Sequence, residues 1–126
     1  VTLDTKKNNN QPKGKKNMKL FTEKQTEQLL KNGHDLETDH KPVVKLVCEG
    51  STWLVTEIDQ HNTDKIFGLR DHGVAEPELV YESIRELEAR KGPMGLRVER
   101  DMYFKADGPL RGYWEKLSTN MYPNLF

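Results

Sequence analysis

The sequence lacks most of the features that identify an activity by motif. Its single cysteine, Cys48, can form neither an internal disulfide nor a cysteine pair for zinc. No glycine-rich loop is followed by the lysine and helix of a phosphate-binding loop, no serine lies in a nucleophile elbow, and no two histidines share a helical spacing. The expected strands also lack the acid–x–lysine tripeptide that is common in metal-dependent nuclease cores. No common enzyme class is therefore indicated by a motif.

Long apolar segments are absent as well. Hydrophobic residues make up 34% of the 126 residues and charged residues 32%, which predicts one domain with a modest core. No apolar run approaches the roughly 20 residues that span a bilayer, and the N-terminus has no apolar signal segment. We therefore expect a cytoplasmic protein with no membrane partner. Cys48, within the apolar run "VVKLVCEG", is expected to be a small buried hydrophobe.

The balanced net charge conceals an asymmetry. Residues 1–17 hold five lysines and one aspartate, a net charge of +4, so the remaining chain carries −4 from fifteen basic and nineteen acidic residues. The basic segment has no aromatic residue, and we expect it to be a disordered tail. We interpret it as an extension before an internal start at Met18, although a basic arm could instead contact nucleic acid. The acidic remainder argues against a DNA-binding face dominated by phosphate contacts, so direct nucleic-acid binding is the less favoured interpretation.

Helix and turn signals divide the rest of the chain. A capping box at "TEKQ" (22–25) and Gly33 predict a helix over residues 23–32. A second capping box at "SIRE" (83–86) begins a helix that ends near Arg90. Pro109 begins a third helix, whose apolar spacing predicts docking on a sheet. The apolar positions of that last helix are Leu110, Tyr113, Trp114 and Leu117.

Between these helices, β-rich segments alternate with turns. The predicted strands are "VVKLVCEG" and "STWLVTEID", joined as a hairpin, then "KIFGLRD", "ELVYES" and a fifth strand or strand pair in "LRVERDMYFK". The connections are too short for parallel crossovers. We therefore expect a single α+β domain over residues 18–118, followed by a C-terminal tail at 119–126. It should contain a small, mostly antiparallel sheet of about four to five strands, with an N-terminal, a middle and a C-terminal helix packed on it. Both tryptophans, Trp53 and Trp114, should be buried.

Acidic side chains adjoin the apolar runs of several expected strands. Alternation would place Glu57 on one face with Trp53, and Asp71 on one face with Phe67. If these faces coincide, both carboxylates lie toward the same end of one sheet surface, and Glu78 begins the next strand. Glu57, Asp71 and Glu78 could then hold Mg²⁺ or Mn²⁺ through hard oxygen ligands.

The interpretation that we prefer needs no metal and no cofactor. The acids would then lie at strand ends, facing water or pairing with Arg70, Arg97 or Arg100. Glu99 and Asp101 also share a face of their strand, and no residue is assigned a catalytic role. The candidate binding surface comprises Glu57, Asp71, Glu78, Glu99, Arg100 and Asp101.

Each of the four histidines lies within two residues of an aspartate. The pairs are His34–Asp35, Asp39–His40, Asp59–His61 and Asp71–His72. A carboxylate can orient an imidazole for metal binding or proton transfer. All four pairs lie in predicted turns, however, where aspartate is favoured because it bonds the local backbone. We prefer turn chemistry as the explanation.

A resemblance is carried by several segments taken in order. The segments are "MKLFTEKQ…LLKNG", "KPVVKL", "TWLVTEID", "FGLRDHG", "PELVYESIRELE", "GPMGLRVERDMYFKA" and "PL". From Met18 to Tyr113 the chain resembles the bacterial domain-of-unknown-function family 2958. The motif positions that correspond are Trp53, Glu57, Asp71, Gly73, Glu78, Glu99, Arg100 and Asp101. The chain departs from the family pattern at Gln60, where proline is usual, at Arg70, where cysteine is frequent, and at His72, where leucine is usual, so a cysteine-based role is in doubt.

The resemblance implies a context rather than a reaction. Relatives occur on conjugative plasmids, phages and other mobile elements, sometimes fused to larger polyvalent proteins, and some carry a single-stranded DNA endonuclease label. Three hypotheses follow. The preferred one is a non-enzymatic protein that uses an acidic surface to inhibit a nucleic-acid-binding host defence protein, as an anti-restriction or anti-CRISPR factor. The alternatives are an accessory protein-binding module of conjugation machinery and a Mg²⁺- or Mn²⁺-dependent nuclease.

Overall fold

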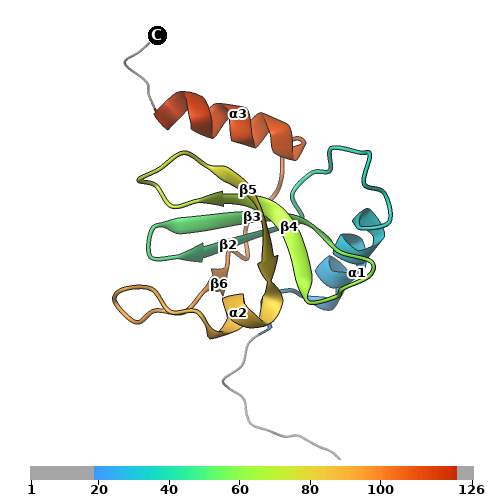
Figure 1. Cartoon of the computed structure of the whole chain (residues 1–126), viewed down its shortest axis with the longest axis horizontal. Helices are drawn as coiled ribbons and strands as arrows, with labels where there is room; N and C mark the ends of the chain where they lie inside the picture. The colour runs from blue at the N-terminus through green and yellow to red at the C-terminus, as the bar shows by residue number, and fades with distance from the viewer. Residues whose placement is uncertain (1–18, 122–126) are drawn as a thin grey trace, which may run out of the picture.

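The computed structural model describes residues 19–121, so the expected tail at 1–17 lies outside the described residues. Within them, three helices accompany one open antiparallel sheet of five strands in the order β5-β4-β3-β2-β6 (Figure 1). The elements are α1 (Glu23–Asn32), β2 (Val44–Cys48), β3 (Ser51–Ile58), β4 (Lys65–Asp71), β5 (Glu78–Ser83), α2 (Ile84–Ala89), β6 (Glu99–Arg100) and α3 (Leu110–Met121). The predicted α+β class is confirmed.

The helix signals act as their sequences predict, with two small differences. The Thr22 hydroxyl accepts the N–H of Gln25, whose side chain accepts the N–H of Thr22, which completes the capping box of α1. At α2 the Ser83 hydroxyl accepts the N–H of Glu86, but the reciprocal bond is not formed. Helix α3 begins after Pro109 and continues to Met121, beyond the expected boundary at 118.

The predicted β2–β3 hairpin is confirmed, and its turn has two residues. Cys48 pairs with Ser51, and the intervening Glu49 and Gly50 have φ angles of 46° and 96°. Two positive φ angles are typical of a type I′ turn, whose twist matches that of the flanking strands. Glycine adopts such angles without a Cβ clash, so the "EG" pair fixes this register.

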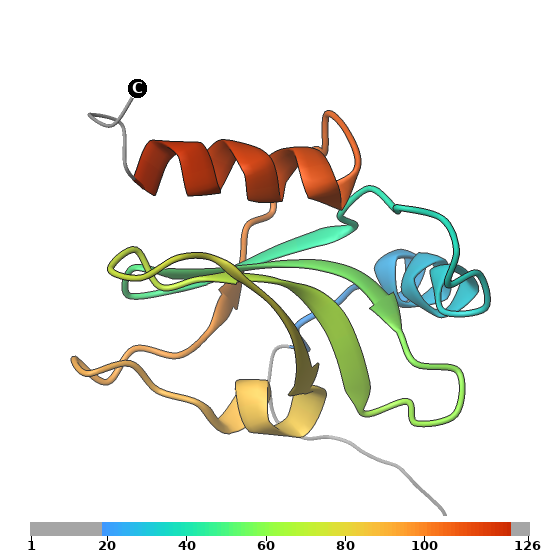
Figure 2. The ribbon, with the colours of Figure 1, turned by 45° about the horizontal axis from the view of Figure 1, so that its top comes forward.

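The sheet separates two apolar layers. On one face, Trp53 and Val55 pack with Leu29 of α1 and Leu87 of α2. On the other face, α3 lies across the sheet and Leu110 packs on Leu54 and Leu69 (Figure 2). Trp53 is 1% exposed, as predicted, and Cys48 is buried, also as predicted. Because the strands supply apolar side chains to both faces, a main cluster forms beneath α1 and α2 and a smaller one beneath α3.

Two expectations about packing and strand length were wrong. Trp114 is 36% exposed, because it lies at the border of the α3 layer, where its indole N–H donates to the carbonyl oxygen of Pro77 over 3.3 Å. The fifth strand is only Glu99–Arg100, since the chain leaves β2 after two paired residues and Asp101 begins a turn. A single bridge between Lys91 and Arg97 precedes it.

Candidate functional site

The structure separates the two carboxylates that were expected to meet. Glu57 pairs with Phe67, whereas Asp71 pairs with Thr52 at the other end of the antiparallel β3–β4 ladder. The prediction that both acids lie toward one end of the sheet is therefore wrong. A bulge between Val55 and Glu57 also turns Glu57 away from Trp53 and onto the α3 face, which corrects the predicted shared face.

Glu78 belongs to a polar network on the opposite face. The Arg70 guanidinium donates to Glu78 over 3.2 Å and to Glu82 over 3.0 Å, and the Trp53 indole N–H donates to the same Glu82 oxygen over 3.0 Å. The guanidinium of Arg90 lies 5.4 Å from the Trp53 ring centroid. Pairing of an acid with Arg70, part of the interpretation preferred from the sequence, is thus confirmed for Glu78. Through both carboxylates, Arg70 ties the end of β4 to β5.

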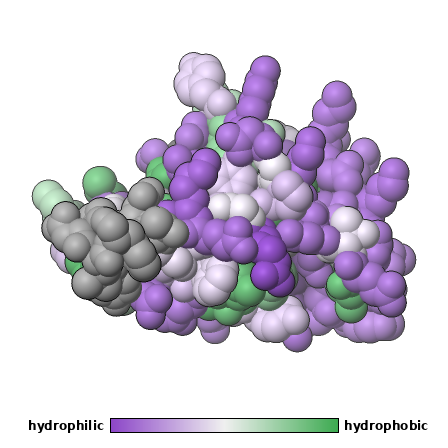
Figure 3. All heavy atoms as spheres, turned by 90° about the horizontal axis from the view of Figure 1, so that it is seen from above, coloured by the Kyte–Doolittle hydropathy of each residue, from purple (hydrophilic) through white to green (hydrophobic). Residues whose placement is uncertain are grey.

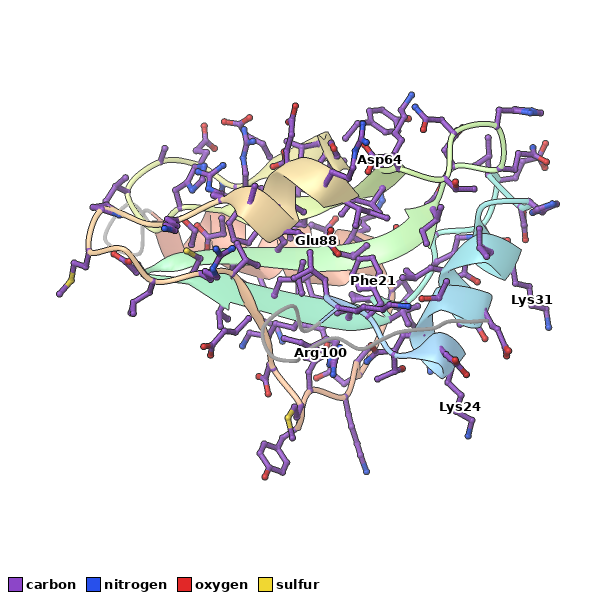
Figure 4. All side chains as sticks on the ribbon, turned by 90° about the horizontal axis from the view of Figure 1, so that it is seen from below. Phe21, Lys24, Lys31, Asp64, Glu88 and Arg100 are labelled. Carbon is purple, nitrogen blue, oxygen red and sulfur yellow. The ribbon has the colours of Figure 1, made fainter. Side chains whose placement is uncertain are left out.

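The remaining predicted surface residues lie at the other edge of the sheet, on and after β6. The Arg100 guanidinium donates to the carbonyl oxygen of Lys19 over 3.1 Å, and the Asp101 carboxylate lies 3.8 Å from the Lys45 amine. Glu99 is exposed. Figure 4 shows Arg100 on the underside of the sheet. Since β5 and β6 are opposite edges, the six predicted residues do not form one continuous surface.

The predicted metal ligands are therefore not assembled. Glu57 and Asp71 lie at different ends of their ladder, and Glu78 projects from the other face of the sheet. Among residues 19–121, no group of three histidine, cysteine, aspartate or glutamate side chains is placed to hold a metal ion.

The histidine–aspartate pairs are explained by turn chemistry. The carboxylates of Asp35, Asp59 and Asp71 each accept the backbone N–H two residues further on. Asp39 instead accepts the N–H of Arg111 over 3.3 Å and so caps α3 from a distant loop. The His72 ring bonds the hydroxyl of Ser51 over 2.7 Å. The turn interpretation is confirmed for three aspartates, and the fourth has a capping role that the sequence did not reveal.

Two further acids, Asp35 and Asp59, lie near Glu57 at the end of β3. We call Asp35, Glu57 and Asp59 the acidic end. Partial burial raises the pKa of Glu57, a change that His40 and the Thr56 hydroxyl oppose and that Asp59 and Asp35 reinforce. The pKa of Asp35 is lowered, chiefly because its carboxylate accepts a short hydrogen bond of 2.6 Å from the Thr38 hydroxyl. No described lysine or arginine forms an ion pair with these three carboxylates.

Glu49 is a structural anchor that sequence reasoning missed. Its carboxylate accepts the N–H of Met94 over 2.8 Å and that of Leu96 over 2.7 Å, and so fixes the loop between α2 and β6. A Cβ at Gly92 would lie 2.4 Å from the carboxyl carbon of Glu49, so a larger residue there would have to displace this carboxylate. The sequence shows only a turn at Glu49, because the partner amides lie more than forty residues away.

Two hollows flank α1. The larger, of about 550 Å³, is open and lies beside His40, with Lys41, Lys105 and Phe104 among its lining residues. The smaller, of about 230 Å³, is mostly apolar, and Phe21 and Glu88 line it near the centre of the view in Figure 4. The labelled Lys24 and Lys31 of α1 point outward in the same view. Neither hollow contains the predicted acid set.

Most of the surface seen from above is hydrophilic, with small separate hydrophobic areas (Figure 3). None of the helices within residues 19–121 is long and apolar enough to cross a membrane.

Neither a curated protein nor a solved structure matches the chain. One protein family matches residues 20–121, which include every helix and strand described above. The chain therefore belongs to the family described as "Protein of unknown function (DUF2958)".

Proposed function

We propose that this chain is a non-enzymatic binding protein of a mobile genetic element and that it binds a protein partner through its acidic end. The partner that suits such a surface is a host defence protein that binds nucleic acid. Its nucleic-acid channel would present lysine and arginine side chains that carboxylates can contact. In that role the chain would be an anti-restriction or anti-CRISPR inhibitor.

The observation that carries the proposal is that Asp35 and Asp59 lie near enough to Glu57 to raise its pKa, an effect that His40 opposes. Elsewhere in the described chain, the Lys45–Asp101 pair and the two Arg70 pairs neutralise carboxylates locally. No lysine or arginine within residues 19–121 forms an ion pair with the acidic end. Unpaired charges of one sign attract a partner of opposite sign and raise its association rate.

The same surface offers apolar contacts beside the charges. Glu57, Phe67 and Tyr81 lie opposite one another on three neighbouring strands, so their side chains share the α3 face. Tyrosine is enriched in protein interfaces, whereas isolated acids are depleted from the interface core. A partner that docks on the acidic end could therefore bury Tyr81 while its cations meet the carboxylates at the rim.

The two alternatives differ in their relation to this geometry. A conjugation accessory module would use the same kind of protein contact, and only the identity of its partner would distinguish it from an inhibitor. The nuclease hypothesis depended on Glu57, Asp71 and Glu78 meeting at one place, and the described structure does not bring them together. We therefore favour a binding function.

The test begins with a pull-down from host lysate and continues with the purified captured protein. The variant Asp35→Asn/Glu57→Gln/Asp59→Asn removes the three charges of the acidic end with little change in volume. If each exposed charge contributes roughly 0.2–1 kcal/mol, the dissociation constant should rise by about 3-fold to 150-fold. Wild-type binding should also weaken as salt rises, because screening reduces attraction between exposed charges.

A matched control removes three exposed charges elsewhere. Glu27→Gln/Glu86→Gln/Glu115→Gln gives the same change in net charge on the three helices. We expect it to bind the partner almost as the wild type does. Equal weakening by both variants would indicate only a net-charge effect, and unchanged binding by the first variant would contradict the proposal.

A further inference from the structure

Strand β5 is an uncovered edge of the sheet. It is the last strand in the order β5-β4-β3-β2-β6, and no strand within residues 19–121 pairs with its outer side (Figures 1 and 2). The opposite edge, β6, contains only Glu99–Arg100. Of the two edges, only β5 offers a long row of backbone groups to another chain.

The register identifies which backbone groups point outward. The N–H of Ile84 donates to the carbonyl oxygen of Asp64, and this pair continues the β4–β5 register. Hydrogen-bonded pairs alternate with non-hydrogen-bonded pairs along an antiparallel ladder. Glu78, Val80 and Glu82 therefore bond β4, whereas the N–H and C=O groups of Leu79 and Tyr81 point away from it.

The side chains of β5 differ between its two faces. Leu79 and Tyr81 lie on the α3 face and are 53% and 64% exposed. Tyr81 is held in place, since its ring lies 5.1 Å from that of Phe67 and 4.4 Å from the amine of Lys65. On the other face the Glu78 side chain is 58% exposed although it is paired with Arg70. The edge thus presents an apolar face and, on the other face, the exposed Glu78 carboxylate beside its partner Arg70.

The composition of β5 disfavours one register of pairing with a second copy. In an antiparallel pair centred on Val80, Glu78 of one copy would lie opposite Glu82 of the other. Directly opposed like charges destabilise a strand pair. The strand nevertheless has none of the lysine, internal proline or bulge that often blocks an edge against all partners. It is therefore open to a strand of complementary charge.

We propose that β5 binds an extended segment of a partner protein by strand addition. The segment would alternate apolar residues, which cover Leu79 and Tyr81, with lysine or arginine residues, which face Glu78. Its backbone would bond the outward N–H and C=O groups of Leu79 and Tyr81, as in other complexes formed by β-augmentation. The sheet would gain a sixth strand beside β5.

Strand addition is a binding mode that the proposed function does not require. Both proposals expect a partner with lysine and arginine side chains. The two can fail separately. Unchanged partner binding after neutralisation of the acidic end would contradict the proposed function alone. A β5 edge that never accepts a strand would contradict this inference alone.

The test uses the full chain and an acetylated, amidated peptide of alternating lysine and valine residues. Amide exchange followed by NMR should show the N–H groups of Leu79 and Tyr81 exchanging about tenfold more slowly with bound peptide, as expected for newly formed main-chain hydrogen bonds. A peptide of alternating glutamate and valine should bind less tightly, because its carboxylates would face Glu78.

A pair of variants separates the backbone contribution from the side chain. Leu79→Pro removes the outward N–H without removing a β4 hydrogen bond, which an edge strand tolerates. Leu79→Ala removes the side chain and keeps that N–H. Leu79→Pro should weaken peptide binding about tenfold more than Leu79→Ala does, the effect of roughly one lost main-chain hydrogen bond.

Three results would overturn the proposal. The first is equal binding of the two peptides. The second is unchanged amide exchange at Leu79 and Tyr81, either in the complex with the lysine–valine peptide or, if no complex forms, at a high concentration of that peptide. The third is protection of these amides without peptide together with a dimer in sedimentation, which would assign the edge to a second copy. If Leu79→Pro does not fold, amide exchange in the wild-type chain still decides between these results.

Discussion

The two tryptophans provide a matched test of the packing described above. Trp53 is enclosed between the sheet, α1 and α2, whereas Trp114 lies at the border of the α3 layer with about a third of its surface exposed. Trp53→Ala would leave an enclosed cavity and remove the indole donor from Glu82, so we expect a loss near the upper end of about 3–5 kcal/mol. Trp114→Ala would leave no enclosed cavity, and alanine favours a helix, so we expect roughly 1–2 kcal/mol.

These magnitudes can be separated in a domain of this size. Each kcal/mol shifts the melting temperature of a domain of about 100 residues by roughly 4–8 °C. Trp53→Ala should therefore lower it by roughly 15–40 °C and Trp114→Ala by less than about 16 °C. Urea unfolding followed by circular dichroism gives the two free energies directly. If Trp53→Ala prevents folding, Trp53→Phe, which keeps a buried ring, should restore a cooperative transition.

The order of the two losses decides the outcome. A free energy of unfolding that falls as much for Trp114→Ala as for Trp53→Ala would refute the division into an enclosed and a border site. Trp53→Phe removes the hydrogen bond to Glu82 together with part of the buried ring, while Arg70 still pairs with that carboxylate. We expect it to cost about 1–3 kcal/mol, less than complete truncation.

Two further predictions concern pH and have opposite signs. The folded pKa of Glu57 is raised above its usual value, mainly by burial, so its ionisation lowers the stability of the fold as pH rises through that folded pKa. Glutamine does not ionise. The free energy of unfolding of Glu57→Gln, compared with that of the wild type, should therefore be more favourable at pH 7 than at pH 4. Urea unfolding at both pH values measures this, and a larger deficit of the variant at pH 7 would contradict it. The pKa of Asp64 is lowered, chiefly by the Ser83 hydroxyl and then by the Arg85 N–H, so its contribution is present above the unfolded pKa and is lost as pH falls through the folded pKa. Asp64→Asn should destabilise the chain at pH 7 but much less at low pH, and a deficit that does not depend on pH would show that ionisation is not the cause.

The sequence predicted the elements well because their signals are local. The capping box at Thr22, the "EG" turn at Glu49 and Gly50, and the alternation in "KIFGLRD" each depend on residues within a few positions of one another. Those signals correctly predicted the bounds of α1, β4 and β5. Local periodicity also placed Trp114 on the docking side of α3, but it could not show that Tyr113 and Leu117 pack on the cluster while Trp114 stays 36% exposed.

The candidate site was harder to predict because it depends on long-range pairing. The carboxylate of Glu49 bonds amides at Met94 and Leu96, and Asp39 caps α3 at Arg111. Nothing near Glu49 or Asp39 in the sequence indicates these partners. The expectation that Glu57 and Asp71 share one end failed for a simpler reason: both are near the C-terminal ends of adjacent antiparallel strands, and such ends lie apart.

The bulge in β3 explains why charge and apolar surface meet on one face. Thr56 is buried and its hydroxyl donates to the carbonyl oxygen of Phe67 over 3.3 Å, while Glu57 takes the position opposite Phe67. Without the extra residue, strict alternation would direct Glu57 toward the Trp53 layer, where an ionised carboxylate is costly. With it, Glu57 joins Phe67 and Tyr81 in a row that ends at the uncovered edge of the sheet. One irregular residue thus places Glu57 on the same face as Leu79 and Tyr81, two strands in from the β5 edge.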